Sequence, residues 1–256
     1  MDRTYVVTGA ASGIGAATTD YLRRQGARVI ACDLRTGDVA ADLTTPAGRG
    51  RLVDGVTQLS GGRIDAIVAN AGGGPAETSL ALNFFGAVAT LEGLRPLLDA
   101  SAAPRAVMVS SIASLRPSDP VLVEACLALD EPAASRAAQA RIAAGDALAL
   151  YANAKHALNA WCRRAAIEPQ WAGAGIPLNG VALGFFDTPA AAYILSDADL
   201  SAQAARMVPV RGAFPGRPDQ AAAALAWCVS PENSMMTGQI LFVDGGAERL
   251  AFGGQS

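Results

Sequence analysis

Short apolar runs rich in β-branched residues alternate along this chain with longer alanine-rich segments. The runs occupy 4–9, 28–33, 65–72, 105–111, 177–184 and 239–246, and helix-like segments lie near 13–25, 46–60, 78–100, 150–172 and 218–230. Runs that are apolar at nearly every position are typical of strands buried on both faces. Strands that alternate with helices predict a parallel sheet covered on both sides, and right-handed crossovers make that sheet doubly wound. We expect about six or seven strands, with residues 39–42 as a further short one.

The chain has 256 residues, of which 51% are hydrophobic. That amount is enough for one large core, so we expect a single domain over residues 1–256. Two stretches interrupt the even rhythm of strands and helices. The first, at about 112–149, contains three prolines and a helix-like piece and is interpreted as an insertion. The second, at about 185–217, is rich in apolar side chains, and long excursions of this kind commonly form lids or binding loops.

The charge pattern restricts the kinds of partner. The formal net charge is −3, and the sequence has no run of basic residues and no long uninterrupted apolar stretch. We therefore expect neither nucleic acid nor a membrane as partner. The four cysteines are widely spaced without a CxxC pair, and the only histidine is His156. This pattern favours reduced cysteines in a cytoplasmic protein and no metal site.

A glycine-rich turn, TGAASGIG, follows the first expected strand and opens the first helix. Its glycines are Gly9, Gly13 and Gly15, with Ser12 and Ile14 between them. A strand, a glycine turn and a helix N-terminus together suit a dinucleotide pyrophosphate, and this unit makes the expected α/β fold Rossmann-type. The spacing GxxxGxG differs from the common GxGxxG pattern, and the alternative reading is a tight turn without a ligand.

An acidic residue, Asp33, ends the second expected strand. A carboxylate at that place can accept hydrogen bonds from adenosine ribose hydroxyls and would repel a 2′-phosphate, which favours NAD over NADP. Arg35 is a nearby cation that weakens this preference. Ligands bind where parallel strands end, so the residues after three strands are further cofactor candidates. They are Leu34, Asp42, Leu43, Asn70, Ala71 and Gly72.

Tyr151 and Lys155 stand four residues apart in the helix-like stretch LYANAK. This spacing places both side chains on one helix face. An adjacent ammonium lowers the pKa of a phenol, and a phenol with a lowered pKa can act as an acid or base near neutral pH. Taken alone, the pair indicates little beyond two solvated side chains.

The motifs gain meaning from their order: TGAASGIG, Asp33, NAG at 70–72, NFFGA at 83–87, VSS at 109–111, YANAK and VALGFFDTP at 181–189. In this order and over essentially the whole chain they resemble the short-chain dehydrogenase/reductase family. The resemblance implies that Tyr151 is the acid/base, that Lys155 holds the nicotinamide ribose and lowers the tyrosine pKa, and that Ser111 orients the substrate oxygen. It also implies a water relay at Asn83 and a mainly structural role for Asn70.

The resemblance further implies cofactor contacts from Gly184, Phe186 and Thr188, and NAD as the cofactor. Members of the family usually carry proline where this chain has Leu183, which relaxes the backbone beside the nicotinamide. The apolar segment 185–217 is the expected substrate lid, with Phe185 and Tyr193 joining Ser111 and Tyr151 as substrate contacts. Apolar linings suit apolar ligands, so we expect a small hydrophobic ketone or secondary alcohol such as a steroid or another alicyclic or aromatic carbonyl compound.

The long segment between Ser111 and Tyr151 is similar to the bacterial 3α-hydroxysteroid dehydrogenase/carbonyl reductase branch of the family. Because it precedes the catalytic helix, we expect it to influence subunit contacts in a homo-oligomer, favouring a dimer over a tetramer. Two alternatives stay open from the sequence. One is a nucleotide-binding regulatory protein that has lost catalysis, and the other is a sugar-nucleotide epimerase or dehydratase, which normally has a longer chain.

Overall fold

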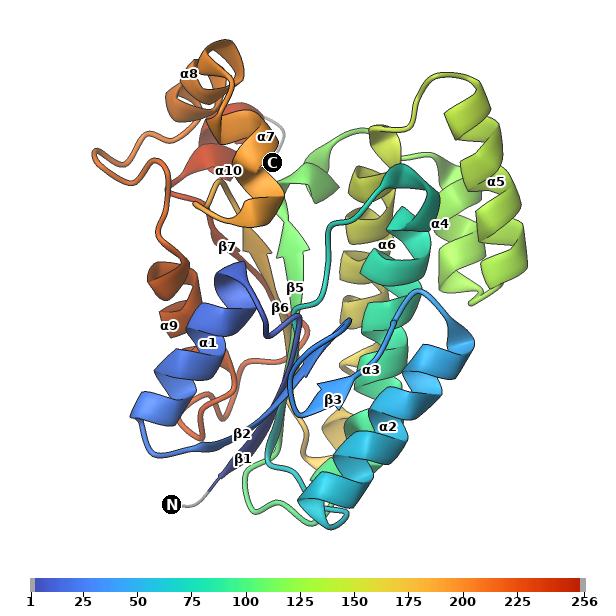
Figure 1. Ribbon diagram of the computed structural model, residues 1–256, viewed down its shortest axis with the longest axis vertical. Helices are drawn as coiled ribbons and strands as arrows, with labels where there is room; N and C mark the ends of the chain where they lie inside the picture. The colour runs from blue at the N-terminus through green and yellow to red at the C-terminus, as the bar shows by residue number, and fades with distance from the viewer. Residues whose placement is uncertain (1–2, 254–256) are drawn as a thin grey trace.

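A computed structural model describes residues 3–253 and contains one seven-stranded parallel sheet. The strands are β1 (Thr4–Thr8), β2 (Arg28–Asp33), β3 (Val39–Ala40), β4 (Ala66–Ala69), β5 (Arg105–Ser111), β6 (Leu178–Leu183) and β7 (Ile240–Val243). Their order in the sheet is β3-β2-β1-β4-β5-β6-β7. Each neighbouring pair is parallel, so all strands end at the same edge (Figure 1). The predicted doubly wound α/β fold is confirmed, and 39–42 contributes the short seventh strand.

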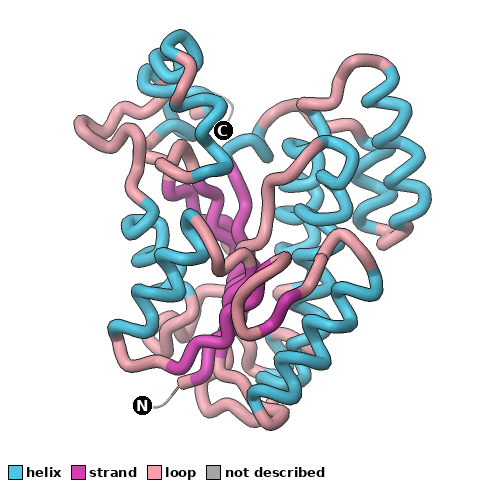
Figure 2. The backbone as a smooth tube through the Cα atoms, viewed as in Figure 1, coloured by secondary structure: helices cyan, strands magenta, loops and turns pink. Residues whose placement is uncertain are grey.

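Helices cover both faces of this sheet (Figures 1 and 2). On one face lie α1 (Gly13–Arg24) and α9 (Pro218–Cys228), which pack against each other. The other face carries α2 (Pro46–Ser60), α3 (Ala87–Leu94) and α6 (Ala149–Ala165). Alternate residues of each strand point to opposite faces, and β5 therefore sends Ala106 and Met108 into one buried cluster and Val107 and Val109 into the other.

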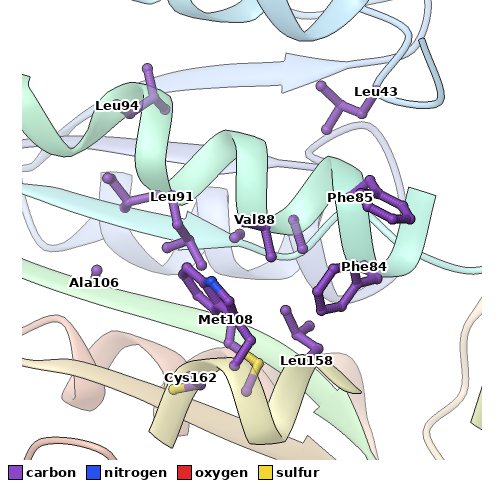
Figure 3. Packing of buried hydrophobic residues seen from close by; sticks show 14 of the residues in the cluster. Leu43, Phe84, Phe85, Val88, Leu91, Leu94, Ala106, Met108, Leu158 and Cys162 are labelled. Carbon is purple, nitrogen blue, oxygen red and sulfur yellow. The ribbon is translucent and has the colours of Figure 1, made fainter. Parts of the chain in front are cut away.

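The larger cluster lies between the sheet and the α3–α6 layer. Figure 3 shows Phe84, Leu91, Met108 and Leu158 meeting there, from four different elements. All four side chains are fully buried. Trp171 is also fully buried and donates its indole N–H to Glu92 at 3.1 Å, so its polar atom is satisfied within the core. This core fixes α6 against β5 and the π-helix described next.

The expected helix at 78–100 is divided into shorter pieces. A 3-10 turn, η1 (Ala76–Thr78), is followed by a π-helix, η2 (Ala81–Gly86), then by α3 and by the 3-10 turn η3 (Arg95–Leu98). The π-helical turn coincides with Asn83, whose amide donates to the Ser79 carbonyl at 2.9 Å, an acceptor that an α-helix would use for its own backbone. Pro96 lies at the start of η3, where it interrupts the α-helical pattern.

The two irregular stretches fold into short helices. The 112–149 segment contains η4 (Ile112–Leu115), α4 (Pro120–Leu127) and α5 (Glu131–Ala143). Helix α5 matches the helix-like piece in the sequence, whereas α4 was not expected. The 185–217 segment contains η6 (Pro189–Ala191), α7 (Ala192–Leu195) and α8 (Ala198–Arg206). The remaining elements are η5 (Ala172–Ala174) and α10 (Ala247–Phe252), and α10 lies against η4.

Candidate active site

The carboxyl ends of the strands gather nearly all of the predicted site residues at one edge of the sheet. In Figure 1, α7 and α8 lie on one side of the strand ends, and α4 and α5 lie on the other. Among the described residues, no group of three or more His, Cys, Asp and Glu side chains could hold a metal ion, and no helix is long and apolar enough to cross a membrane. All four cysteines are free and buried, and burial raises the pKa of each thiol to about 12.

The glycine turn has the shape of a phosphate cradle. Gly9 and Gly13 adopt positive φ angles of 68° and 51°, which favour glycine over every other residue. A Cβ atom on Gly15 would overlap the Gly9 carbonyl oxygen, so the backbone of the turn packs directly on the start of α1. Ser12, the N-cap residue of α1, makes no side-chain capping bond. The first amides of that helix are thus left for another acceptor, as an anion-binding turn requires.

Asn70 and Thr8 hold this glycine turn in place through hydrogen bonds. The Asn70 amide donates to the Thr8 carbonyl at 3.0 Å, and the Thr8 hydroxyl accepts from the Asn70 and Ala71 N–H groups at 3.1 Å each. These bonds tie the end of β4 to the end of β1. A Cβ atom on Gly9 would lie only 2.9 Å from the Ala71 Cα, so both strand ends depend on a glycine at position 9. Asn70 therefore has the structural position that the resemblance implied.

Asp33 ends β2 beside the same turn. Its two carboxylate oxygens accept from the Ala11 N–H at 2.9 Å and from the Leu34 N–H at 2.7 Å. The carboxylate thus holds the glycine turn as well as facing the expected ribose position. Leu34 follows it with 52% of its surface exposed. An ionised carboxylate has about four acceptor positions, so two remain for ligand hydroxyls.

Two other predicted cofactor residues have mainly internal contacts. The Asp42 carboxylate accepts from the Thr44 N–H and hydroxyl at 3.0 and 2.6 Å, and these bonds lower its pKa. Leu43 is buried in the core, and its carbonyl accepts from Arg49 at 2.8 Å. The structure therefore gives both residues a role in joining β3 to α2.

Ser111, Tyr151 and Lys155 come together from β5 and the first two turns of α6. The Lys155 ammonium lies 5.7 Å from the centroid of the Tyr151 ring. It donates to the Val109 carbonyl at 2.8 Å and is 2% exposed, whereas the Tyr151 side chain is half-buried. The Ser111 side chain lies near enough to the Tyr151 phenol to lower its pKa. The three predicted catalytic residues therefore form one cluster.

The electrostatics of this cluster differ from the expectation drawn from the sequence. Burial raises the pKa of Tyr151, against a smaller lowering by the nearby Ser111 side chain. Burial lowers the pKa of Lys155 to about 7 from its ordinary value of 10.5. The protein alone therefore does not lower the tyrosine pKa through this lysine. The physical reason is that both groups lie in a poorly solvated place, which disfavours phenolate and ammonium alike.

Asn83 packs close to Lys155, with Gly72 between them. A Cβ atom on Gly72 would lie 2.9 Å from the Asn83 Oδ1 and 3.4 Å from the Lys155 Nζ. The Asn83 side chain accepts from the Gly73 N–H and donates to the Gly73 and Ser79 carbonyls, each at 2.9 Å. Its amide therefore holds the loop after β4 and uses both of its N–H groups, so an acceptor position on Oδ1 and the backbone are left for the relay that the resemblance implied.

The segment after β6 begins next to the glycine turn. The Thr188 side chain lies 3.3 Å from the position that a Cβ atom on Gly13 would take. Gly184 packs against Asp244, because a Cβ atom on Gly184 would lie only 2.8 Å from the Asp244 Cα. Phe186 is buried, and the Phe185 ring meets Phe214 edge-on at 6.1 Å. Leu183 fills the usual proline position at the end of β6, where it is buried and pairs with Ser111.

Tyr193 brings the 185–217 segment close to Tyr151. It lies on α7, is 67% exposed, and stands near enough to Tyr151 to raise the pKa of that residue. The two substrate contacts predicted in segment 185–217 are thus separated. Tyr193 lies near Tyr151, whereas Phe185 lines a small cavity of about 140 Å³ with Phe186, Val208 and Val243.

Several polar residues that support the site were not predicted. Asn159 donates to the Ser114 hydroxyl at 2.9 Å, and His156 donates through Nδ1 to the Ser114 carbonyl at 3.1 Å. Both residues lie on α6 and pin η4, the turn that follows Ser111. His156 therefore makes a structural contact here. Polar residues on the buried face of an otherwise apolar helix were the available sequence signal.

Comparison with known proteins assigns the family. The family model described as enoyl-(acyl carrier protein) reductase matches residues 9–248. The chain is 32% identical over 250 residues to the 3-alpha-hydroxysteroid dehydrogenase/carbonyl reductase of Comamonas testosteroni, with 96% of each chain covered. It is also 32% identical over 262 residues to the cis-4-hydroxycyclohexanecarboxylate dehydrogenase of Sinomonas cyclohexanicum, again with 96% of each covered.

A solved structure extends the likeness to three dimensions. The 3-alpha-hydroxysteroid dehydrogenase of Pseudomonas sp. B-0831, determined in complex with NADH, is 36% identical, with a TM-score of 0.90 over 99% of this chain and 100% of that one. The chain belongs to the short-chain dehydrogenase/reductase family of oxidoreductases. The predicted resemblance, including its hydroxysteroid dehydrogenase/carbonyl reductase branch, is confirmed.

Proposed function

We propose that this protein interconverts a hydrophobic secondary alcohol and the corresponding ketone with NAD(H) as cofactor. The observation that carries the proposal is the cluster of Ser111, Tyr151 and Lys155 at the strand edge that also holds the glycine turn. Such a cluster supplies a proton at the oxygen of a carbonyl group. A bound nicotinamide would supply or accept the hydride at its carbon.

Each residue of the cluster has one task in this proposal. In reduction, the Tyr151 hydroxyl gives its proton to the carbonyl oxygen, and the Ser111 hydroxyl orients that oxygen by donating a hydrogen bond. In oxidation, the Tyr151 phenolate removes the alcohol proton. Lys155 holds the nicotinamide ribose, and its ammonium favours the phenolate only while it is charged, which in the protein alone means below about pH 7.

The cradle fits a dinucleotide in its backbone geometry. Gly9, Gly13 and Gly15 leave the space that a pyrophosphate needs, and Thr188 stands at the same place to donate a hydroxyl. Asp33 would accept from the ribose hydroxyls and repel a 2′-phosphate. The NADH bound to the Pseudomonas relative supports the same choice.

The substrate that we propose is an alicyclic alcohol or ketone. Both named relatives act on ring compounds that carry a hydroxyl group, one a hydroxysteroid and the other a hydroxycyclohexanecarboxylate. Tyr193 offers an aromatic, exposed surface opposite Tyr151. We further propose that the protein acts in the cytoplasm as a homo-oligomer, with 185–217 as the lid.

Parallel assays test the function. NADH and NADPH oxidation are measured with steroid, alicyclic and aryl ketones, and NAD⁺ reduction is measured with the matching alcohols. We expect turnover with NADH and at least one cyclic ketone, and a kcat/KM with NADPH that is lower by about tenfold or more, since one unfavourable charge contact of about 1.4 kcal/mol has that effect. Binding of NADH without turnover across the panel would contradict the proposal and favour a regulatory protein.

Replacement of Asp33 by serine tests the cofactor choice. We expect Asp33→Ser to bind NADH more weakly, because the ribose and the Ala11 N–H both lose an acceptor, and to gain relative activity with NADPH. The measurement is the ratio of kcat/KM for the two cofactors. Asp38→Asn is the matched control, because Asp38 lies on the same loop but accepts from Ala31, away from the glycine turn. An unchanged ratio in Asp33→Ser would remove Asp33 as the selecting residue.

A further inference from the structure

Tyr151 occupies a helix end that has no cap of its own. It is the third residue of α6, which begins at Ala149, and the N-cap residue Leu148 makes no side-chain hydrogen bond to the helix. Leu148 is also 84% exposed. The first amides of a helix lack intrahelical acceptors, and those of Ala149 and Leu150 reach the Asp146 and Ala147 carbonyls only at 3.4 and 3.3 Å. Helix ends held by such long bonds open locally at low cost. A side chain that must meet Ser111 in a fixed geometry therefore needs other contacts to hold this turn.

Asn153 supplies the first of these contacts. It lies on α6 between Tyr151 and Lys155 and is only 2% exposed. Its amide nitrogen donates to the Ala149 carbonyl at 2.9 Å, and its amide oxygen accepts from the Asp119 N–H at 2.7 Å. The side chain thus bonds the first residue of α6 to the start of α4. A buried amide with both ends satisfied resists displacement, because moving it leaves polar groups without partners.

Arg141 of α5 completes the connection. Its guanidinium donates to Asp119 at 2.8 and 2.7 Å and to Asp146 at 3.1 Å. Asp119 also caps α4 through the Val121 N–H at 2.9 Å. Although burial opposes ionisation, the hydrogen bonds from Arg141 hold the pKa of Asp119 below its usual value. Asp119 lies near the beginning of the 112–149 segment and Asp146 near its end, so one arginine joins both ends beside Tyr151.

We propose that Asn153 and Arg141 are positioning residues, which act through Asp119 to fix the first turn of α6 and hold the Tyr151 phenol against Ser111. We name Asn153, Arg141, Asp119 and Asp146 the insertion clasp. The proposal gives the inserted segment a task in the reaction, and it rests on Tyr151 being the acid/base. Lys155 is held separately, by the Val109 carbonyl on β5, so the clasp acts on the proton-transfer group and leaves the cofactor contacts in place.

Three variants test the clasp: Arg141→Met, Asn153→Ala and the control Arg136→Met. Arg136 is exposed on the same helix as Arg141, so its replacement removes an equal charge from α5 without touching the clasp. The measurements are kcat, the KM for the ketone, the Kd for NADH, and amide hydrogen exchange of peptides that cover 147–155. Arg141→Lys is added because lysine keeps the charge but does not bridge two carboxylates as a planar guanidinium does.

We expect kcat to fall by about 10-fold to 100-fold in Arg141→Met and Asn153→Ala, because small displacements of a reacting group have effects of that size. Arg141→Lys should lie between these variants and the wild type. The Kd for NADH should change by less than about twofold, since the hydrogen bonds lost in these variants are not those that hold Lys155 or the glycine turn. Exchange should become faster in the first turn of α6, and Arg136→Met should match the wild type in every measurement.

Unchanged kcat and unchanged exchange in Arg141→Met would overturn the proposal. This variant decides the matter if Asn153→Ala does not fold, because the Arg141 side chain is 41% exposed and tolerates replacement better than a buried amide. A fall in melting temperature with kcat unchanged would also overturn it, by reducing the clasp to a stabilising contact. If the wild type reduced no ketone, the proposed function would fail, whereas the exchange result would still decide whether the clasp fixes this turn.

Discussion

Tyr151→Phe should lose turnover by a factor of about 10² to 10⁴ and keep its affinity for NADH. The range is that expected when a general acid or base is removed. The substitution deletes one oxygen from a half-buried side chain, so the ring still packs beside Lys155 and Ser111. Steady-state kinetics give kcat, and quenching of protein fluorescence or enhancement of NADH fluorescence gives Kd. Ketone KM should change much less than kcat, because the lost interaction belongs to the transition state.

The matched control for this experiment is Tyr21→Phe. Tyr21 lies on α1 and packs against the second buried cluster, far from the proton-transfer groups. This variant should keep wild-type kcat within about twofold, which is the size of effect expected from one distant polar atom. Turnover in Tyr151→Phe close to that of Tyr21→Phe would remove Tyr151 as the acid/base and with it the basis of the insertion clasp.

Lys155 should titrate near neutral pH in the protein alone. It is the only lysine of the 256 residues, so a chain labelled with ¹³C at lysine Cε gives one resonance to follow. We expect a midpoint of about 7, far below the ordinary 10.5, because the ammonium is buried and, among residues 3–253, hydrogen-bonds only the Val109 carbonyl. A midpoint near the ordinary value would show that water reaches this amine and would contradict the buried environment.

The lowered pKa of Lys155 also makes the stability of the fold depend on pH. Because the pKa of Lys155 is lower in the folded chain than in the unfolded one, the unfolded chain binds the proton more tightly. Between about pH 7 and about pH 10.5 the unfolding free energy of the wild type should therefore rise with pH as far as this group is concerned. Lys155→Met removes that pH dependence and should lose activity. Its unfolding free energy should exceed that of the wild type most clearly below about pH 7, where the wild type buries a charged ammonium.

Urea unfolding of both chains at several pH values measures this difference. Arg163→Met, on the same helix but exposed, is the control for a general loss of positive charge. If the difference in unfolding free energy between Lys155→Met and the wild type does not change with pH, the titration of this amine is not its cause, and the prediction fails. The other nineteen lysine or arginine positions of this chain are all arginine, whose guanidinium stays charged, so Lys155 is the only one of these twenty whose charge can vary.

Much of the fold followed from residue patterns alone. Fully buried parallel strands have no polar face, so the sequence at β1, β2, β4, β5 and β6 is recognisable without any knowledge of neighbours. Right-handed crossovers then make the sheet doubly wound, whereas the order β3-β2-β1-β4-β5-β6-β7 came from the structure. The helix boundaries were less predictable. Helix α4 depends on a tertiary arrangement in which Asp119 both caps it and accepts from Arg141, and the π-helix at Asn83 depends on bonds to Gly73 and Ser79.

The candidate site likewise contains residues that the sequence predicted and residues that only the structure revealed. Gly9, Gly13, Gly15 and Asp33 were predictable because a short local segment of chain dictates their geometry. Ser111 and Tyr151 lie 40 positions apart in the numbering, and only their order among the other motifs joined them before the structure was known. The role of Asn153, although it lies within YANAK, could not be predicted. Ala149 lies one helical turn before it, but its other partner, Asp119, is 34 residues away in the chain.

The sequence by itself determined the parallel sheet, the phosphate turn and the pair of a tyrosine and a lysine on one helix face, because each depends on local periodicity or on backbone conformations that only certain residues adopt. The tertiary structure decided what surrounds that pair. Burial raises the pKa of Tyr151 and lowers that of Lys155, contrary to the effect of their spacing alone, because desolvation depends on everything packed around a group. It likewise decided that the inserted segment reaches the first turn of α6, since Arg141 meets Asp119 only when two distant stretches fold together.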